Sequence, residues 1–306
     1  MAITAKDVQK LREMTGVGMM DCKNALTETD GDIDKAIEWL REKGLAAQTK
    51  KAGKIAAEGV SYAIAADNGV GVIIEVNSQT DFVAKNEVFQ DFVKNLANLV
   101  ATESPADVEA LKACTYPGTD RSVTDVTADK VLSIGENLQI RRFVRYAQGV
   151  SVPYIHMNGK IGVLVNLTIE GIEAAKVTEL GKDVAMQIAA MNPSFLDKSD
   201  VDQSTLDKEK EILMIQAKED PKNASKPENI IEKMVMGRVG KFYEENCLLQ
   251  QAFVKENKLS VEQYVAQTAK RLGGSIAVAA FTRFETGEGI EKKEDDFAAE
   301  VASMIN

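Results

Sequence analysis

The sequence predicts an α+β protein built from several units along one chain. One observation behind this is that a pair of β-type runs followed by an amphipathic helix occurs twice. A second is that segments with helical spacing lie before the first copy and inside the second. With 306 residues, 44% of them hydrophobic, the chain can bury a sizeable core, and its length favours two or more domains.

Residues 1–54 are predicted to form a bundle of three short helices. The run Thr-Ala-Lys-Asp at 4–7 forms a capping-box-like start to the first helix, and the glycines within 15–18 end it. The third helix begins at the turn 30–32, and we expect it to stop at Gly44. The lysines beyond this glycine are expected to form an exposed tether: Lys50, Lys51 and Lys54. A bundle of this size suits a binding module of the ubiquitin-associated type.

An internal repeat organises the centre of the chain. Gly59 and Gly149 lie 90 residues apart (149 − 59), and Gly71 and Gly162 lie 91 apart (162 − 71). The helix that follows each pair of strands has apolar residues at helical spacing. They are Val88, Phe92, Leu96 and Leu99 in the first copy, and Val177, Leu180, Val184, Ile188 and Met191 in the second.

The repeat predicts two related core subdomains. We place the first at 55–140 and the second at 141–199 together with 244–280. Each is expected to hold a small antiparallel sheet covered by helices on one face. The apolar and aromatic runs at 141–146 and 279–284 are expected to supply further strands.

The segment 200–243 is predicted to be a protruding antiparallel helical hairpin, with helices at 205–218 and 227–243. Apolar residues of the two helices are expected to face each other: Leu206, Ile212, Leu213 and Ile215 against Ile230, Met234, Val235 and Val239. The last segment, 281–306, is predicted to be a C-terminal module with a strand, a turn at 287–289 and an acidic amphipathic helix.

Composition restricts the class of protein. The net charge of −10 argues against a nucleic-acid or anionic-membrane surface, because binding to phosphates needs clustered cations. It suits a protein partner with basic patches. The three cysteines are few and far apart, which favours reduced thiols, and no apolar run approaches about 18 residues. With no signal or transit segment, the prediction is a cytoplasmic protein.

The run 77–87, Asn-Ser-Gln-Thr-Asp-Phe-Val-Ala-Lys-Asn-Glu, is the main candidate site. It follows a β-type run at 71–76 and precedes a helical one at 88–100. Binding groups are often placed in loops on such a rigid frame. Asp81 and Phe82 could therefore form a wedge for a protein pocket. The alternative is that Phe82 packs under its own helix.

The sequence contains no motif with the residue types and spacing that catalysis, metal binding or nucleotide binding requires. His156 is the only histidine, and no nucleophile lies near it in sequence. The acidic turn at 30–34 begins like a calcium loop but has Lys35 and Arg41 where Gly and Glu are required. No Gly-Lys pair is followed by Ser or Thr. We expect no enzyme activity, no metal site and no cofactor, and no nucleotide held by the chain itself.

Four segments resemble one family, in its order and from end to end of the chain. Thr-Asp-Phe-Val at 80–83 resembles the signature of bacterial elongation factor Ts, the family of exchange factors for elongation factor Tu. Residues 15–26 are similar to its N-terminal motif, 134–142 to its mid-chain motif and 283–291 to its C-terminal motif.

The resemblance implies a role for each candidate residue. In the family, the loop carrying Thr80, Asp81, Phe82 and Val83 enters the partner near its magnesium ion and disturbs the coordination of that ion. The expected partner is elongation factor Tu, in its GDP-bound and nucleotide-free forms. Mg²⁺ binds oxygen ligands together with the nucleotide's phosphates, so a disturbed shell loosens the phosphates.

Further partner contacts are expected outside the loop. From the residues alone, Val17, Met19 and Met20 could form a small exposed apolar patch, or Met19, Met20 and Leu26 could be core. The resemblance favours the patch, because the family's N-terminal module contacts the GTPase domain of the partner. His156 lies in a segment similar to one near the partner. The 200–243 hairpin is expected to serve self-association, because the resemblance implies that such hairpins pair exchange factors.

Two other classes of protein remain as alternatives. A small-molecule enzyme would need a base, a nucleophile or a phosphate loop that the sequence does not offer. A non-catalytic adaptor with a ubiquitin-associated-like domain fits residues 1–54 but leaves the loop at 80–86 without a role.

Overall fold

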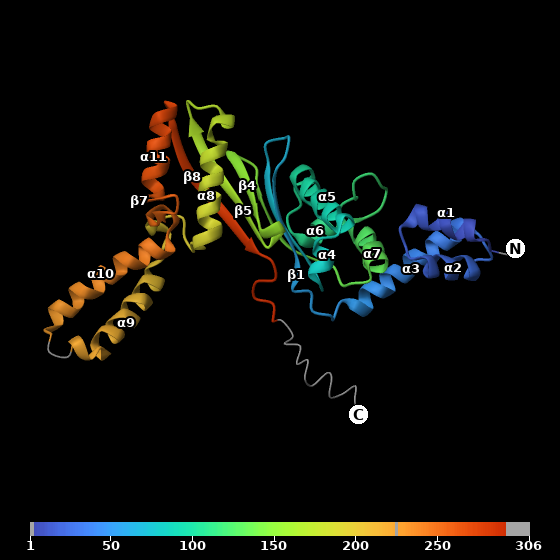
Figure 1. Cartoon of the computed structure of the whole chain (residues 1–306), viewed down its shortest axis with the longest axis horizontal. Helices are drawn as coiled ribbons and strands as arrows, with labels where there is room; N and C mark the ends of the chain where they lie inside the picture. The colour runs from blue at the N-terminus through green and yellow to red at the C-terminus, as the bar shows by residue number, and fades with distance from the viewer. Residues whose placement is uncertain (1–2, 224–225, 292–306) are drawn as a thin grey trace.

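The structure is a computed structural model that describes residues 3–223 and 226–291. It is a mixed α and β protein whose sheets are antiparallel, as predicted. The N-terminal helices and a helical hairpin lie at opposite ends, with two sheets side by side between them (Figure 1). Within the described ranges, no helix has the length and apolarity that crossing a membrane requires.

The N-terminal bundle consists of α1 (Ala5–Thr15), α2 (Met19–Glu28) and α3 (Ile33–Lys51). The capping box at the start of α1 is confirmed, because Thr4 and Asp7 exchange side-chain and backbone hydrogen bonds. The three helices share a small core: Val8, Leu11, Val17, Cys22, Ala25, Leu26, Ala36 and Leu40.

The predicted end of the third helix at Gly44 is wrong. α3 continues to Lys51, so two lysines of the expected tether are helical, and the Lys51 ammonium donates a hydrogen bond to the Gly135 carbonyl. Gly44 is buried where α3 crosses α7 (Val123–Ile134), and a Cβ there would lie 3.2 Å from the Ala128 carbonyl oxygen. Glycine therefore serves close helix packing here and not helix termination.

The first sheet contains β1 (Glu58–Ala65), β2 (Gly71–Ser78) and β3 (Gln139–Tyr146), in the order β1-β2-β3. The helix α5 (Glu87–Glu103) packs on it, and the short α6 (Val108–Ala113) and α7 complete the unit. These two short helices had not been predicted. The boundary drawn at 140 is also wrong, because β3 pairs with β2 and so belongs to the first sheet.

The second sheet contains β4 (Val150–His156), β5 (Ile161–Glu170) and β8 (Ser275–Glu285), in the order β4-β5-β8. α8 (Thr178–Met191) and α11 (Val261–Leu272) pack against it, and β6 (Ala252–Phe253) pairs with β7 (Glu256–Ser260) beside them.

The start of the C-terminal module at residue 281 falls inside a strand. β8 pairs with β5 on both sides of this position, so the strand assigned to 281–306 is part of the second sheet. The turn at 287–289 follows it directly, with positive φ at both glycines. The acidic helix predicted beyond residue 291 lies outside the described residues.

The two sheets pack against each other through equivalent positions of the two repeats. A Cβ on Gly71 of β2 would overlap the Ser151 side chain of β4, and a Cβ on Gly162 of β5 would lie 2.9 Å from the Ser61 carbonyl of β1. The register with the neighbouring strand shifts at the same place in each central strand: Arg141 of β3 is the extra residue opposite the step from 75 to 76 in β2, and Ala279 of β8 is the extra residue opposite the step from 166 to 167 in β5. Both relations follow the 90- to 91-residue offset of the sequence repeat.

The hairpin consists of α9 (Gln203–Glu219) and α10 (Glu228–Asn246). Its seam contains Leu206, Leu213, Met214, Ala217, Ile231, Val235, Val239 and Tyr243. Ile212, Ile215 and Ile230, predicted to lie in the seam, are exposed instead. The two helices face each other with neighbouring positions instead of those predicted, which leaves these isoleucines on the surface.

Candidate functional site

The chain turns sharply after β2, and Thr80 caps a single helical turn, α4 (Asp81–Ala84). The Thr80 hydroxyl accepts a hydrogen bond from the Val83 amide at 3.4 Å. Val83 points into the core of the first sheet, whereas Phe82 is 79% exposed. Phe82 therefore does not pack under its own helix. The turn is anchored by one apolar side chain and presents another to solvent.

Glu136, which lies between α7 and β3, holds this turn through hydrogen bonds. Its carboxylate accepts hydrogen bonds from the backbone amides of Gln79 and Thr80, at 3.0 Å each, and from the Thr80 hydroxyl at 2.6 Å. The sequence analysis gave Glu136 no role. The available signal was its place in the motif at 134–142, but nothing in the sequence indicated that the motif reaches a turn 56 residues earlier.

Asp81 is held by an ion pair with Lys85 one helical turn later, at 2.6 Å, and both side chains are largely exposed. The hydrogen bond from Lys85 and, to a smaller extent, the positive charges of Lys85 and Lys160 hold the pKa of Asp81 below its ordinary value. Asp81 therefore carries a full negative charge at neutral pH. The ion pair contributes little to stability, because water screens it.

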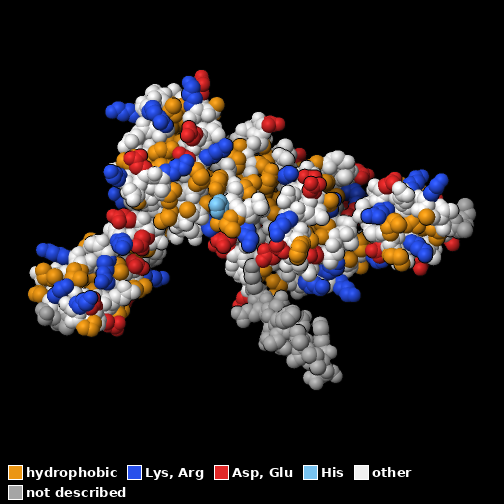
Figure 2. Space-filling model, viewed as in Figure 1, with side chains coloured by type: hydrophobic (Ala, Val, Ile, Leu, Met, Phe, Trp, Pro, Cys, Tyr) orange, Lys and Arg blue, Asp and Glu red, His pale blue; other side chains and the backbone are white. Residues whose placement is uncertain are grey.

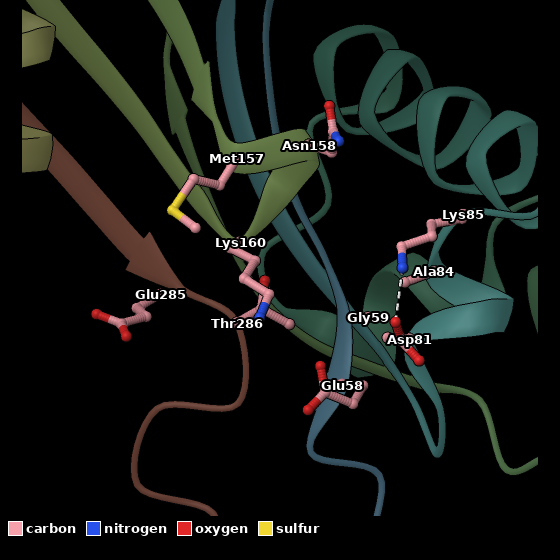
Figure 3. A pocket seen from close by; sticks show the side chains of 10 residues that line it. All are labelled: Glu58, Gly59, Asp81, Ala84, Lys85, Met157, Asn158, Lys160, Glu285 and Thr286. Atoms are coloured by element: carbon pink, nitrogen blue, oxygen red, sulfur yellow. Dashed lines mark hydrogen bonds and ion pairs between the residues drawn. The ribbon is translucent and has the colours of Figure 1, made fainter.

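A cleft of about 440 Å³ lies beside α4. Figure 3 shows the side chains that line it, which come from both sheets. They are Glu58 and Gly59 of β1, Asp81, Ala84 and Lys85, Met157, Asn158 and Lys160 of the β4–β5 turn, Glu285 at the end of β8 and Thr286 directly after it. The cleft thus has carboxylates and ammonium groups on its walls and an exposed methionine at its edge.

A buried carboxylate joins the segment after β8 to the first sheet. Glu75 of β2 is fully buried and accepts hydrogen bonds from Arg141 at 2.9 Å, Arg142 at 2.6 Å and the Gly287 amide at 2.8 Å. Arg142 also pairs with Glu288 at 3.2 Å. The motifs around 80, 141 and 287 therefore meet in one region of the molecule.

The charge state of Glu75 follows from these partners. Burial raises the pKa of the Glu75 carboxyl, but the hydrogen bonds from the Gly287 amide, Arg142, Arg141 and Asn77 outweigh it and leave the pKa below its ordinary value. An ionised carboxylate is stable in this buried position only because several donors surround it.

Of the other predicted contacts, Val17, Met19 and Met20 lie in the N-terminal bundle, whereas His156 directly precedes Met157 at the cleft. Val17 was expected in an exposed patch, but it is only 2% exposed and belongs to the core of the bundle, because it fills the turn between α1 and α2. Met19 and Met20 are exposed at the start of α2. His156 is exposed at the end of β4, where its Nδ1 atom is 3.0 Å from the Tyr154 hydroxyl.

The described residues contain no group of three or more His, Cys, Asp or Glu side chains that could hold a metal ion. The arrangement instead offers an exposed apolar side chain, a charged carboxylate beside it and a cleft between two sheets. These are features of a surface that binds another macromolecule.

Comparison with known proteins identifies the family. The sequence model of "Elongation factor TS" matches residues 79–288, more than half of the chain. The chain belongs to the elongation factor Ts family. It is 47% identical to elongation factor Ts of Syntrophotalea carbinolica over 306 residues and 50% identical to that of Clostridium perfringens over 305 residues, in each case over 99% of both chains.

Family membership makes the chain a translation elongation factor of protein biosynthesis, and it confirms the resemblance seen in the four sequence motifs. The family match begins at Gln79, the first residue whose amide is bound by Glu136, and ends at Glu288, which pairs with Arg142. It therefore includes the turn at 80–83 and most of the residues that line the cleft, whereas Glu58, Gly59 and the buried Glu75 lie before it. The N-terminal bundle lies before it and is covered by the full-length relatives.

Proposed function

We propose that this chain binds elongation factor Tu, in its GDP-bound and nucleotide-free forms, and promotes release of GDP. The observation that carries the proposal is the turn at 80–83. Phe82 is 79% exposed on a turn whose backbone is held by hydrogen bonds, and the negative charge of Asp81 lies next to it. Large aromatic side chains that leave solvent on binding are frequent sources of binding energy.

Exchange follows from differential binding. A factor that binds the nucleotide-free partner more tightly must weaken the binding of the nucleotide by the same factor. Moving the partner from about 1:99 to 99:1 between its two states takes roughly 5.5 kcal/mol of such difference. One turn is too small to supply this alone. The cleft, Met19 and Met20 on α2, and His156 are proposed as additional contact regions.

Phe82 and Asp81 act in different ways in this proposal. Phe82 enters an apolar pocket of the partner and holds the turn there. Asp81 gives up its exposed ion pair with Lys85 and rearranges polar groups around the partner's Mg²⁺, which loosens the phosphates. No covalent bond forms or breaks, so the chain acts as a binding protein and not as an enzyme, and we propose that it does so in the cytoplasm.

The hairpin of α9 and α10 is proposed to serve self-association. Ile212, Ile215, Ile230 and Met236 are exposed on it, outside the seam between its own helices. Figure 2 shows hydrophobic side chains among charged ones on this part of the surface. A two-fold pair of hairpins, the commonest oligomeric symmetry, would cover these side chains.

Release of a fluorescent GDP from purified elongation factor Tu tests the main proposal. Catalytic amounts of this chain should speed the release while consuming no nucleotide. An unchanged release rate at saturating chain would exclude exchange activity and would favour a non-catalytic adaptor.

Replacement of 204–233 by a short Gly-Ser turn tests the hairpin separately. Release of GDP should persist, and the mass of the complex should fall toward one copy of each protein. A shortened chain that keeps its assembly mass would show that the hairpin does not pair the copies.

A further inference from the structure

The carboxylate of Glu136 binds the turn before Phe82 through three hydrogen bonds. One oxygen accepts from two consecutive backbone amides, those of Gln79 and Thr80, and the other accepts from the Thr80 hydroxyl. Hydrogen bonds to a carboxylate are stronger than those between neutral groups. We propose that Glu136 is a positioning residue for nucleotide exchange, which holds the turn in the conformation that presents Phe82. This inference rests on the proposed function.

The bonds of Thr80 make the turn rigid on both sides. Its amide and hydroxyl both donate to Glu136, while its carbonyl accepts from the Ser78 hydroxyl at 3.0 Å. Because the single hydroxyl proton of Thr80 goes to Glu136, the oxygen is left to accept from the Val83 amide. The path from the end of β2 into α4 is therefore set by Glu136 and Ser78 together.

Packing alone does not set the direction of Phe82. α4 has four residues, and a helix this short is not stable by itself in water. Its buried side chain is Val83, whereas Phe82 leaves most of its surface in solvent. The direction of Phe82 consequently depends on the backbone of the turn, which Glu136 holds.

Glu136 is itself fixed from the opposite side by the end of the N-terminal bundle. The Lys51 ammonium at the end of α3 donates to the Gly135 carbonyl, and the Asn137 amide group donates to the Lys54 carbonyl at 2.8 Å. The segment 135–137 is thereby held between the bundle and the turn. A turn ordered before binding avoids the entropy loss of being ordered during binding.

Glu136→Ala tests the role in exchange. We expect the maximal rate of GDP release at saturating chain to fall about ten- to a hundredfold, the range for losing a charged hydrogen-bond partner. The concentration that gives half-maximal release should change little, because the other contact regions remain. A rise in that concentration with an unchanged maximal rate would overturn the inference.

A double-mutant cycle separates positioning from general structural support. If Glu136 acts through Phe82, adding Glu136→Ala to Phe82→Ala should slow GDP release no further. Two losses that multiply in full would overturn the inference. Glu136→Gln keeps a carbonyl acceptor for the amides, so it should keep the fold while losing the bond from the Thr80 hydroxyl, and it is the second variant if the alanine variant does not fold.

Hydrogen exchange of the free chain tests the clamp without any partner. The amides of Gln79 and Thr80 should exchange at least about tenfold faster in Glu136→Ala, since each loses its acceptor. Glu103→Ala, which removes an exposed carboxylate at the far end of α5, is the matched control and should leave both amides protected. Unchanged protection in Glu136→Ala overturns the inference. Failure of the unmodified chain to release GDP would instead overturn the proposed function.

Discussion

The two repeats of the core share one frame and differ in the turn that follows the central strand. At the 91-residue offset, Ile172 takes the place of Asp81, and Glu173 takes the place of Phe82. Ile172 packs against the core of the second sheet and Glu173 is exposed, which is the usual distribution of an apolar and a charged side chain. The first repeat instead exposes its phenylalanine. The second turn therefore serves folding, and the first has features that folding does not require.

The central strands differ in the same way. Glu75 in β2 lies opposite Arg142, whereas its counterpart Asn166 in β5 lies opposite Ala280. The first repeat thus buries an ionised carboxylate with arginine partners, and the second places a neutral amide there. The buried charge binds the Gly287 amide and so holds the segment after β8 beside the cleft. Both departures from ordinary packing lie in the first repeat, near the candidate site.

The largest effect on stability is expected from Glu75→Ala. Removing this carboxylate takes a buried charge partner from Arg141 and leaves Arg142 with only the more exposed Glu288, which lowers the free energy of unfolding by about 3–5 kcal/mol. Asn166→Ala, the same change in the second repeat, should cost only about 1 kcal/mol. Denaturant unfolding of both variants measures the difference. Equal losses would show that the buried charge is not what distinguishes the repeats.

The same carboxylate gives a pH dependence with a definite sign. Because the pKa of Glu75 in the folded chain lies below its ordinary value of 4.5, the ionised form stabilises the fold at higher pH. This contribution is complete above about pH 4.5 and is lost as the pH falls through the folded-state pKa. Unfolding of the unmodified chain and of Glu75→Gln between pH 3 and 7 should show a gap in stability that narrows toward low pH. A constant gap would contradict the assignment.

A smaller effect, on exchange and not on stability, is expected from Phe82→Ala. Loss of an aromatic anchor typically costs about 2–4 kcal/mol of binding, which corresponds to roughly 30- to 1000-fold slower stimulated GDP release. The free energy of unfolding should change by less than about 0.5 kcal/mol. Ile172→Ala should do the reverse, with a loss of about 1–2 kcal/mol in stability and normal GDP release. Unfolding of the Phe82 variant would show that this side chain is part of the core.

The smallest effect is expected from Asp81→Ala. Its exposed ion pair with Lys85 contributes little to the fold, so stability should be nearly unchanged. Stimulated GDP release should slow about tenfold, because one charged contact is lost. Asp91→Ala, which removes a similar exposed carboxylate paired with Lys94 on α5, is the control. Equal GDP release by the two variants would remove Asp81 from the mechanism.

Features set by neighbours along the chain could be predicted from the sequence. Short stretches of residues determine the capping box at Thr4 and the apolar spacing of α5 and α8. The repeat of strands at a constant offset is likewise visible in short runs of the sequence. The turn at 80–83 was recognisable because a polar run with one aromatic residue interrupts a strand–helix pattern. The family followed from the same local runs.

Features set by contacts between distant segments required the tertiary structure. Gly44 has the sequence appearance of a helix end, yet it is a close-packing point against α7, and Val17 is buried because the bundle closes over it. Glu136 reaches a turn 56 residues earlier, and Glu75 meets an amide 212 residues later. Hydrophobic spacing and helix capping depend on residues within about four positions of each other, so both can be predicted from the sequence alone. Which strand pairs with which, and which carboxylate meets which donor, depends on how the whole chain packs.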